Sequence, residues 1–106
     1  MINPFFKNNG PFKFNEILKD LNLNLDDVEA TLQADPEIKV ITFAHVLGNP
    51  PDIYRLLDIV DHYKLILLED CCDALNSTYD SHPLGSFGTM ASCSFYPAHH
   101  ITCGEG

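Results

Sequence analysis

The middle of the chain changes between two patterns of hydrophobic and polar residues. Residues 38–46 and 64–68 are short runs of β-branched and aliphatic residues, which is typical of strands buried on both faces. Between them, Asp52 is placed to cap a helix whose apolar residues recur at helical spacing: Ile53, Leu56, Leu57 and Val60. Residues 38–70 are therefore predicted to form a β-α-β unit, whose two strands run parallel through a right-handed crossover.

Patterns on either side of this unit predict further elements. A helix is expected to begin at Asn24, with acidic residues in its first turn, and to end before Pro36. The Asp80-Ser81 pair indicates the turn of a short hairpin, and residues 90–96 read as a third strand. The predicted fold class is α/β, with a mixed, mostly parallel sheet and flanking helices.

Length and composition limit the domain organisation. The chain has 106 residues, 45% of them apolar, which suits one small folded domain and excludes a disordered chain. It stops inside the glycine-rich residues 102–106, directly after a predicted strand, where domains rarely end. We therefore expect residues 1–106 to be a single partial domain of a larger protein.

The acidic net charge excludes some classes of binding partner. Fifteen acidic residues against six basic ones give a net charge of −9, which argues against binding to nucleic acid or to an anionic membrane surface. No apolar run approaches the ~18 residues of a membrane-spanning helix, and the N-terminus does not resemble a secretory signal. These observations predict a cytoplasmic protein.

The four cysteines do not follow the spacing of a disulfide framework or a zinc knuckle. The adjacent pair Cys71 and Cys72 is not a C-x-x-C motif, and free thiols in a reducing compartment are the main expectation for all four. A metal site is the alternative, with a ligand set drawn from the last part of the chain: Cys93, Cys103, His99 and His100.

Polar residues gather where the predicted parallel strands end, and ligands of open parallel sheets bind at this edge. Glu69 and Asp70 follow the second strand, and His99 and His100 follow the third. A carboxylate here can hold a cationic ring nitrogen, although Asp70 is equally suited to cap a following helix. The histidines suit a general base or acid, or a solvated loop.

Several motifs together resemble the DegT/DnrJ/EryC1/StrS aminotransferase family. Residues 94–106 read S-F-Y-P-A-H-H-I-T-C-G-E-G, close to the active-site pattern S-F-x-x-x-K-N-I-T-x-G-E-G of that family. Residues 44–50 and 69–75 are similar to its A-H-x-L-G-N-P and E-D-x-C-D-A-L motifs. His99 stands where most members carry the Lys that binds the cofactor, and this exchange resembles the sugar 3-dehydratase branch, its CDP-sugar enzymes in particular.

The resemblance implies an activity and a set of roles. The fold would be part of the large domain of a pyridoxal-phosphate (PLP) transferase of the aspartate-aminotransferase type. The activity would be PMP-dependent removal of the C3 hydroxyl from a nucleotide-linked 4-keto-6-deoxysugar, with pyridoxamine phosphate (PMP) or PLP held non-covalently. Asp70 would bind the pyridinium nitrogen, Asp73 would lie near the ring 3-hydroxyl, Ser94 would bind the phosphate, and His99 would be the catalytic base.

The resemblance also implies what lies outside the chain. The phosphate loop would precede it, and the small domain and any iron–sulfur cluster would follow it. A homodimer is expected for the parent protein, and a reductase partner is an open expectation. The alternatives are a PLP-dependent sugar aminotransferase and a non-enzymatic degenerate or split fragment. Two local departures stand out: Asn76 replaces a family Gly, and Thr89 replaces a family Asp.

Overall fold

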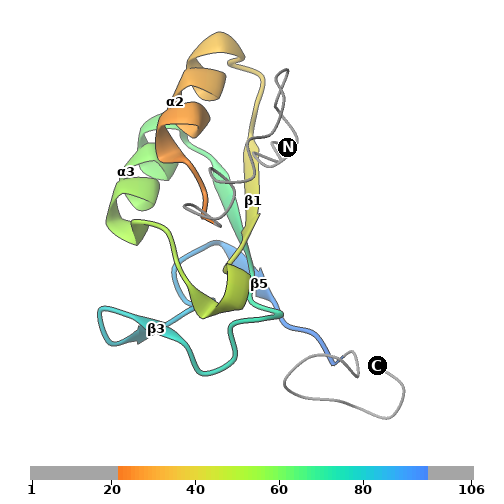
Figure 1. Cartoon of the computed structure of the whole chain (residues 1–106). Helices are drawn as coiled ribbons and strands as arrows, with labels where there is room; N and C mark the ends of the chain where they lie inside the picture. Colours follow the sequence, from red (N-terminus) through yellow and green to blue (C-terminus); the bar gives the residue numbers. More distant parts are fainter. Residues whose placement is uncertain (1–21, 96–106) are drawn as a thin grey trace, which may run out of the picture.

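The computed structural model describes residues 22–95, in which two helices pack on a three-stranded parallel sheet (Figure 1). The strand order is β1-β2-β5, so β2 is central. The elements are α2 (Leu25–Ala34), β1 (Val40–Ala44), a 3-10 turn (Val46–Gly48), α3 (Ile53–Tyr63), β2 (Ile66–Asp70), β3 (Thr78–Tyr79), β4 (His82–Pro83) and β5 (Met90–Ser92). The predicted α/β class and the parallel β-α-β unit are confirmed.

Helix α2 begins and ends where its sequence signals indicate. The Asn24 side chain accepts hydrogen bonds from the backbone N–H groups of Asp26 and Asp27, at 3.1 and 3.4 Å. These bonds satisfy amide groups that have no partner inside the helix. The helix ends at Ala34, two residues before Pro36, as predicted.

Helix α3 begins as predicted, after Asp52. Asp52 caps it by accepting a hydrogen bond from the Arg55 N–H at 3.1 Å. The helix continues to Tyr63 and ends at Lys64, which adopts a left-handed conformation with φ +54°. The prediction that a strand begins at Lys64 is therefore wrong, because this residue closes the helix and β2 begins at Ile66.

The strands are shorter than predicted. β1 covers Val40–Ala44 rather than 38–46, because the chain turns into the 3-10 helix directly after His45. β5 covers Met90–Ser92 rather than 90–96: residues 93–95 do not continue the strand, and Tyr96 lies outside the described residues.

The core lies between the helices and one face of the sheet. Ile41 and Phe43 from β1 and Leu67 from β2 are buried against Val28 and Leu56 from the helices. The alternate residues of these strands are partly or fully exposed, as at Ile66, which is 44% exposed. The prediction that both strand faces are buried is therefore wrong for residues 22–95, in which α2 and α3 cover only one face.

The predicted hairpin is confirmed. β3 and β4 pair antiparallel around Asp80 and Ser81, which both have positive φ, at 47° and 65°. Two successive positive φ values define the tight turn whose twist matches a two-residue hairpin. Asn76 also has a positive φ, at 62°, which explains why glycine suits this position in the resembling family. Neither α2 nor α3 is long and apolar enough to cross a membrane.

Candidate functional site

The three parallel strands end at one edge of the sheet, with Asp70 at its centre. The strand register pairs Asp70 with Ala44 of β1 on one side and with Ser92 of β5 on the other. Glu69 and Asp70 were predicted to follow the strand, but both lie within β2, because they pair with β1 and β5. Asp70 therefore occupies the central position of the edge at which open parallel sheets bind ligands.

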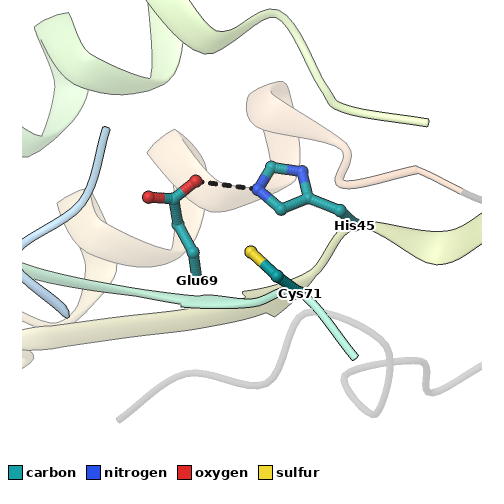
Figure 2. Close-up of side chains that lie close together, drawn as sticks. All are labelled: His45, Glu69 and Cys71. Atoms are coloured by element: carbon teal, nitrogen blue, oxygen red, sulfur yellow. Dashed lines mark hydrogen bonds and ion pairs between the residues drawn. The ribbon is translucent and has the colours of Figure 1, made fainter. Parts of the chain in front are cut away.

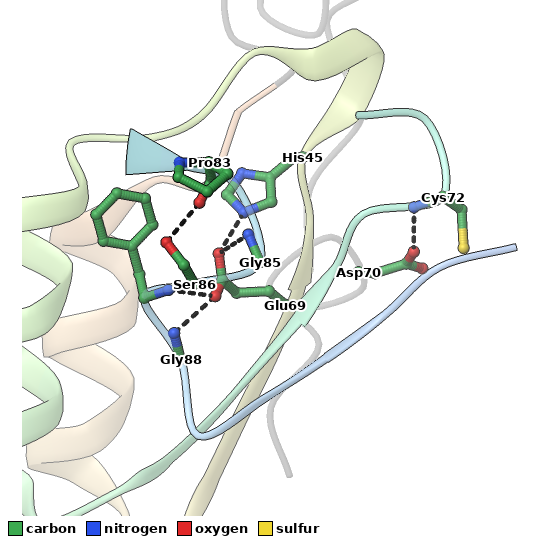
Figure 3. A network of polar contacts seen from close by, with 9 residues as sticks. His45, Glu69, Asp70, Cys72, Pro83, Gly85, Ser86 and Gly88 are labelled. Carbon is green, nitrogen blue, oxygen red and sulfur yellow. Dashed lines mark hydrogen bonds and ion pairs between the residues drawn. The ribbon is translucent and has the colours of Figure 1, made fainter. Parts of the chain in front are cut away.

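The Asp70 carboxylate is half-buried and closes a turn. One of its oxygens accepts a hydrogen bond from the Cys72 N–H at 3.0 Å (Figure 3). A side-chain hydrogen bond to Asp70 also raises the pKa of the Cys72 thiol. No helix follows Asp70 in the described residues, so the helix-cap alternative is wrong. Among residues 22–95 no Lys, Arg or His pairs with this carboxylate, which leaves its charge for a cationic ligand.

The other predicted site residues lie in segments that follow the strands. Asp73 is exposed in the turn after β2, and Ser94 is half-buried two residues beyond the end of β5. Asp70 and Ser94 therefore belong to neighbouring strand ends. His99 and His100 lie outside the described residues, so the role of His99 stays a prediction.

A buried His–Glu hydrogen bond, which the sequence patterns did not indicate, lies next to Asp70 in the sequence. His45 and Glu69 are both 0% exposed at their side chains, and His45 Nε2 lies 2.8 Å from Glu69 Oε1 (Figure 2). Three backbone N–H groups also donate to this carboxylate: Gly85 at 2.9 Å, Phe87 at 2.9 Å and Gly88 at 2.6 Å (Figure 3).

These donors decide the charge of Glu69. Burial alone would raise the pKa of the carboxyl group, but the hydrogen bonds from Gly88, His45, Gly85 and Phe87 outweigh it and lower the pKa. The carboxylate is therefore ionised at neutral pH and only accepts hydrogen bonds. His45 Nε2 consequently carries the proton of this contact. His45 Nδ1 is buried and has no hydrogen-bond partner in residues 22–95.

Cys71 completes a compact group with His45 and Glu69. One potential ligand atom from each residue lies within 4.8 Å of the others. Glu69, however, uses both oxygens for the four hydrogen bonds described above, and burial raises the pKa of the Cys71 thiol to about 11. The group is therefore a hydrogen-bonded cluster whose acceptors are already used, rather than an open cation site. The alternative ligands Cys103, His99 and His100 lie outside the described residues.

The loop that supplies the three amide groups lies directly on β2. A Cβ atom at Gly88 would come within 2.8 Å of the Leu67 carbonyl oxygen, so only glycine fits. Thr89 continues the contact: its N–H donates to the Leu67 carbonyl at 2.8 Å, and its hydroxyl accepts from the Leu67 N–H at 3.2 Å. A side-chain oxygen at position 89 thus extends the ladder between β2 and β5, which a family Asp would also provide.

A parallel sheet with a half-buried carboxylate at the end of its central strand is the arrangement of α/β enzymes that bind a ligand at the carboxyl edge. The DegT/DnrJ/EryC1/StrS aminotransferase family model matches residues 12–106. The chain belongs to this family.

Two relatives show the resemblance at the sequence level. The lipopolysaccharide biosynthesis protein RfbH of Salmonella typhimurium is 42% identical over 93 residues, which cover 85% of this chain and 21% of that protein. The dTDP-4-dehydro-2,6-dideoxy-D-glucose 3-dehydratase of Saccharopolyspora spinosa is 48% identical over 68 residues, which cover 64% of this chain and 15% of that protein. The chain thus spans about a fifth or less of these relatives.

A solved structure shows the resemblance of the fold. A variant of GDP-4-keto-6-deoxymannose-3-dehydratase with bound GDP-perosamine superposes with a TM-score of 0.68 at 27% identity, covering 78% of this chain and 22% of that chain. The fold is therefore part of the PLP-dependent transferase large domain, as predicted.

Proposed function

We propose that this chain is the cofactor-binding segment of a nucleotide-sugar 3-dehydratase, in which PMP or PLP is held without a covalent bond to the protein. The reaction removes the C3 hydroxyl from a nucleotide-linked 4-keto-6-deoxysugar. The observation that carries the cofactor assignment is the position of Asp70, which is central on the carboxyl edge and has no cationic partner in residues 22–95.

Asp70 suits a pyridinium nitrogen on electrostatic grounds. A half-buried carboxylate forms a strong charge-assisted hydrogen bond with a protonated ring nitrogen, and this bond favours the protonated ring. When bound, the cofactor supplies an electron sink for the dehydration. We further propose that Ser94 binds the cofactor phosphate and that Asp73 lies near the ring 3-hydroxyl.

The positions of the described lysines favour a dehydratase over an aminotransferase, which needs a Lys at the cofactor. His99 occupies the position of the family Lys and is proposed to take a proton from the C4′ carbon of the cofactor. Of the described lysines, Lys39 precedes β1 and Lys64 ends α3, so both lie at the opposite edge of the sheet from Asp70. Neither can therefore replace the missing family Lys at the carboxyl edge.

The whole protein is proposed to act as a homodimer on a nucleotide sugar. The RfbH relative is named for lipopolysaccharide biosynthesis and the Saccharopolyspora relative for a dTDP-sugar 3-dehydratase, which supports deoxysugar synthesis as the setting. A reductase partner and a cytoplasmic location belong to the same proposal.

A cofactor titration tests the proposal. The purified chain is titrated with PMP and with PLP, and binding is followed by near-UV absorbance and fluorescence. We expect saturable PMP binding, weakened at least ~10-fold in Asp70→Asn because that substitution removes the charge and keeps the shape. Asp58→Asn, an exposed helical position, is the matched control and should bind PMP as the unchanged chain does.

Two outcomes would contradict the proposal. A folded chain that binds no PMP would show that residues 1–106 do not hold the cofactor. A lysine adduct trapped by borohydride in the presence of PLP would instead identify an aminotransferase.

A further inference from the structure

We propose that Glu69 is a positioning residue for the cofactor edge: it ties the end of β1 and the loop that leads into β5 to the central strand β2, and fixes the direction of Asp70. His45 is its main side-chain partner in this role. The inference rests on the proposed function, since it takes Asp70 as the group that meets the cofactor.

Glu69 and Asp70 are coupled by the geometry of a strand. They are neighbours on β2, and successive side chains of a strand point to opposite faces of the sheet. Figure 3 shows Glu69 pointing toward the loop at residues 85–88 and Asp70 pointing away from it. Because one backbone carries both side chains, anchoring Glu69 sets the rotation of the strand end and thus the direction of Asp70.

The anchors of Glu69 come from both neighbouring strands. His45 directly follows β1, whereas Gly85, Phe87 and Gly88 belong to the loop that leads into β5. One carboxylate therefore binds two segments whose donors lie 16 to 24 residues from Glu69 in the sequence. Its four hydrogen bonds are directional and all to donors, so they define one position for the loop.

Backbone hydrogen bonds also fix the position of the residues around Asp70. The His45 N–H donates to the Asp70 carbonyl at 3.0 Å, and the Cys71 N–H donates to the Ser92 carbonyl at 2.9 Å. Asp70 is thus held on one side by β1 and on the other by β5. Ser94, the proposed phosphate ligand, follows on the same segment as Ser92.

The glycines of the loop allow its backbone to lie close against β2 and Cys71. Besides the contact of Gly88 with Leu67, a Cβ at Gly85 would lie 3.1 Å from Cys71 Sγ, and Gly85 has φ +93°. An apolar residue in place of Glu69 could fill the same volume, but it would leave three loop amides without acceptors and let the loop shift.

The primary test is the isosteric variant Glu69→Gln in the full chain. Its amide NH₂ group must face donors, because every partner of the carboxylate is a donor. The readout is amide hydrogen exchange by NMR at Cys72, whose N–H is bonded to the Asp70 side chain. We expect exchange at Cys72 and Gly88 to accelerate at least ~10-fold, while Phe43 and Leu56 in the core stay protected. Glu37→Gln, an exposed position, removes the same charge and should change neither amide.

Two variants at His45 keep the inference testable if Glu69→Gln does not fold. His45→Leu removes one donor to Glu69, and we expect a several-fold acceleration at Cys72. His45→Gln restores a side-chain N–H and should recover part of the protection, which a volume effect alone would not produce.

The outcomes separate the two proposals. Cys72 protection that is unchanged in Glu69→Gln, or equal in His45→Leu and His45→Gln, would overturn the positioning role. PMP affinity, measured in the same samples, should fall at least ~10-fold in Glu69→Gln, and an unchanged affinity would also overturn the role. Failure of the unchanged chain to bind PMP would contradict the proposed function, independently of the Cys72 result.

Discussion

At the scale of single residues, two buried side chains at the end of β2 have pKa values that are shifted in opposite directions, although burial by itself raises both. Glu69 and Cys71 lie two residues apart on the buried face of the chain, yet the pKa of Glu69 is lowered and that of Cys71 is raised to about 11. The difference lies in the donors: four hydrogen bonds stabilise the Glu69 carboxylate, whereas burial and the nearby charges of Glu69 and Asp70 disfavour a thiolate at Cys71.

Cys71 should therefore react slowly with alkylating reagents. Its pKa of about 11 against an ordinary 9.0 lowers the thiolate fraction about 100-fold, and the thiolate is the nucleophile. At pH 8 we expect iodoacetamide to modify the exposed Cys93 long before Cys71, as followed by peptide mass spectrometry. The same chain in urea is the control and should show comparable rates at both positions. Equal rates in the native chain would contradict the burial of Cys71.

Glu69 should make the stability of the chain depend on pH. Because its pKa is lower in the folded chain than in the unfolded one, its contribution is complete above the unfolded value near 4.5 and is lost as the pH falls through the folded value. Glu69→Gln should cost roughly 2–4 kcal/mol at pH 7 and less in acid. Urea unfolding at pH 7 and at several acidic pH values measures both effects, and a pH-independent cost would contradict an ionised Glu69.

At the scale of elements, local signals predicted where both helices begin, but not where β2 begins. Asn24 and Asp52 cap α2 and α3 through hydrogen bonds within three residues, so a short stretch of sequence contains the whole signal. The predicted strand began at Lys64, but this residue adopts the left-handed conformation that closes α3, which no residue preference indicates, so β2 begins two residues later.

Lys64→Gly should stabilise α3. Glycine adopts the positive φ of this position without the steric cost that Lys bears, and we expect a gain of about 0.5–1 kcal/mol in the free energy of unfolding. Lys39→Gly, at an exposed position just before β1, is the control and should destabilise the chain slightly. Thermal or urea unfolding measures both, and a loss of stability in Lys64→Gly would contradict the conformation of residue 64.

The candidate site could be predicted only in part, because some of its contacts join residues that are far apart in the sequence. Asp70 was found from its place after an apolar run, because the carboxyl edge of a parallel sheet follows from topology. The partners of Glu69 come from loop amides 16 to 19 residues further along, and such donors have no sequence pattern. His45 belongs to a family motif, but its pairing with Glu69 depends on the parallel register of β1 and β2.

At the scale of the whole molecule, the sheet in residues 22–95 has an outer strand with an unpaired edge on each side, and several apolar side chains are exposed. β1 and β5 are the outer strands of this described part. Leu47 is 76% exposed and Met90 on β5 is 63% exposed. The chain spans about a fifth or less of its relatives, and open edges with apolar residues promote pairing with other chains.

The isolated chain should therefore self-associate at micromolar concentrations. We expect light scattering after size-exclusion chromatography to show species larger than 11.9 kDa, and Met90→Lys to reduce them because a charge on an outer strand opposes pairing. Glu37→Lys, which adds a Lys at an exposed position away from the sheet edges, is the control. A monomeric unchanged chain would contradict this expectation.

The hydrogen bonds of Glu69 also impose an order on biosynthesis. The Gly88 N–H that completes them is added 19 residues after Glu69 itself. At synthesis rates of about 5–20 residues per second, the ribosome needs about 1–4 s to add it. During that interval β1, α3 and β2 are already made, but the carboxylate lacks three of its four donors and cannot be buried without a large desolvation cost. The nascent β-α-β unit therefore remains open until the loop at residues 85–88 emerges and closes it.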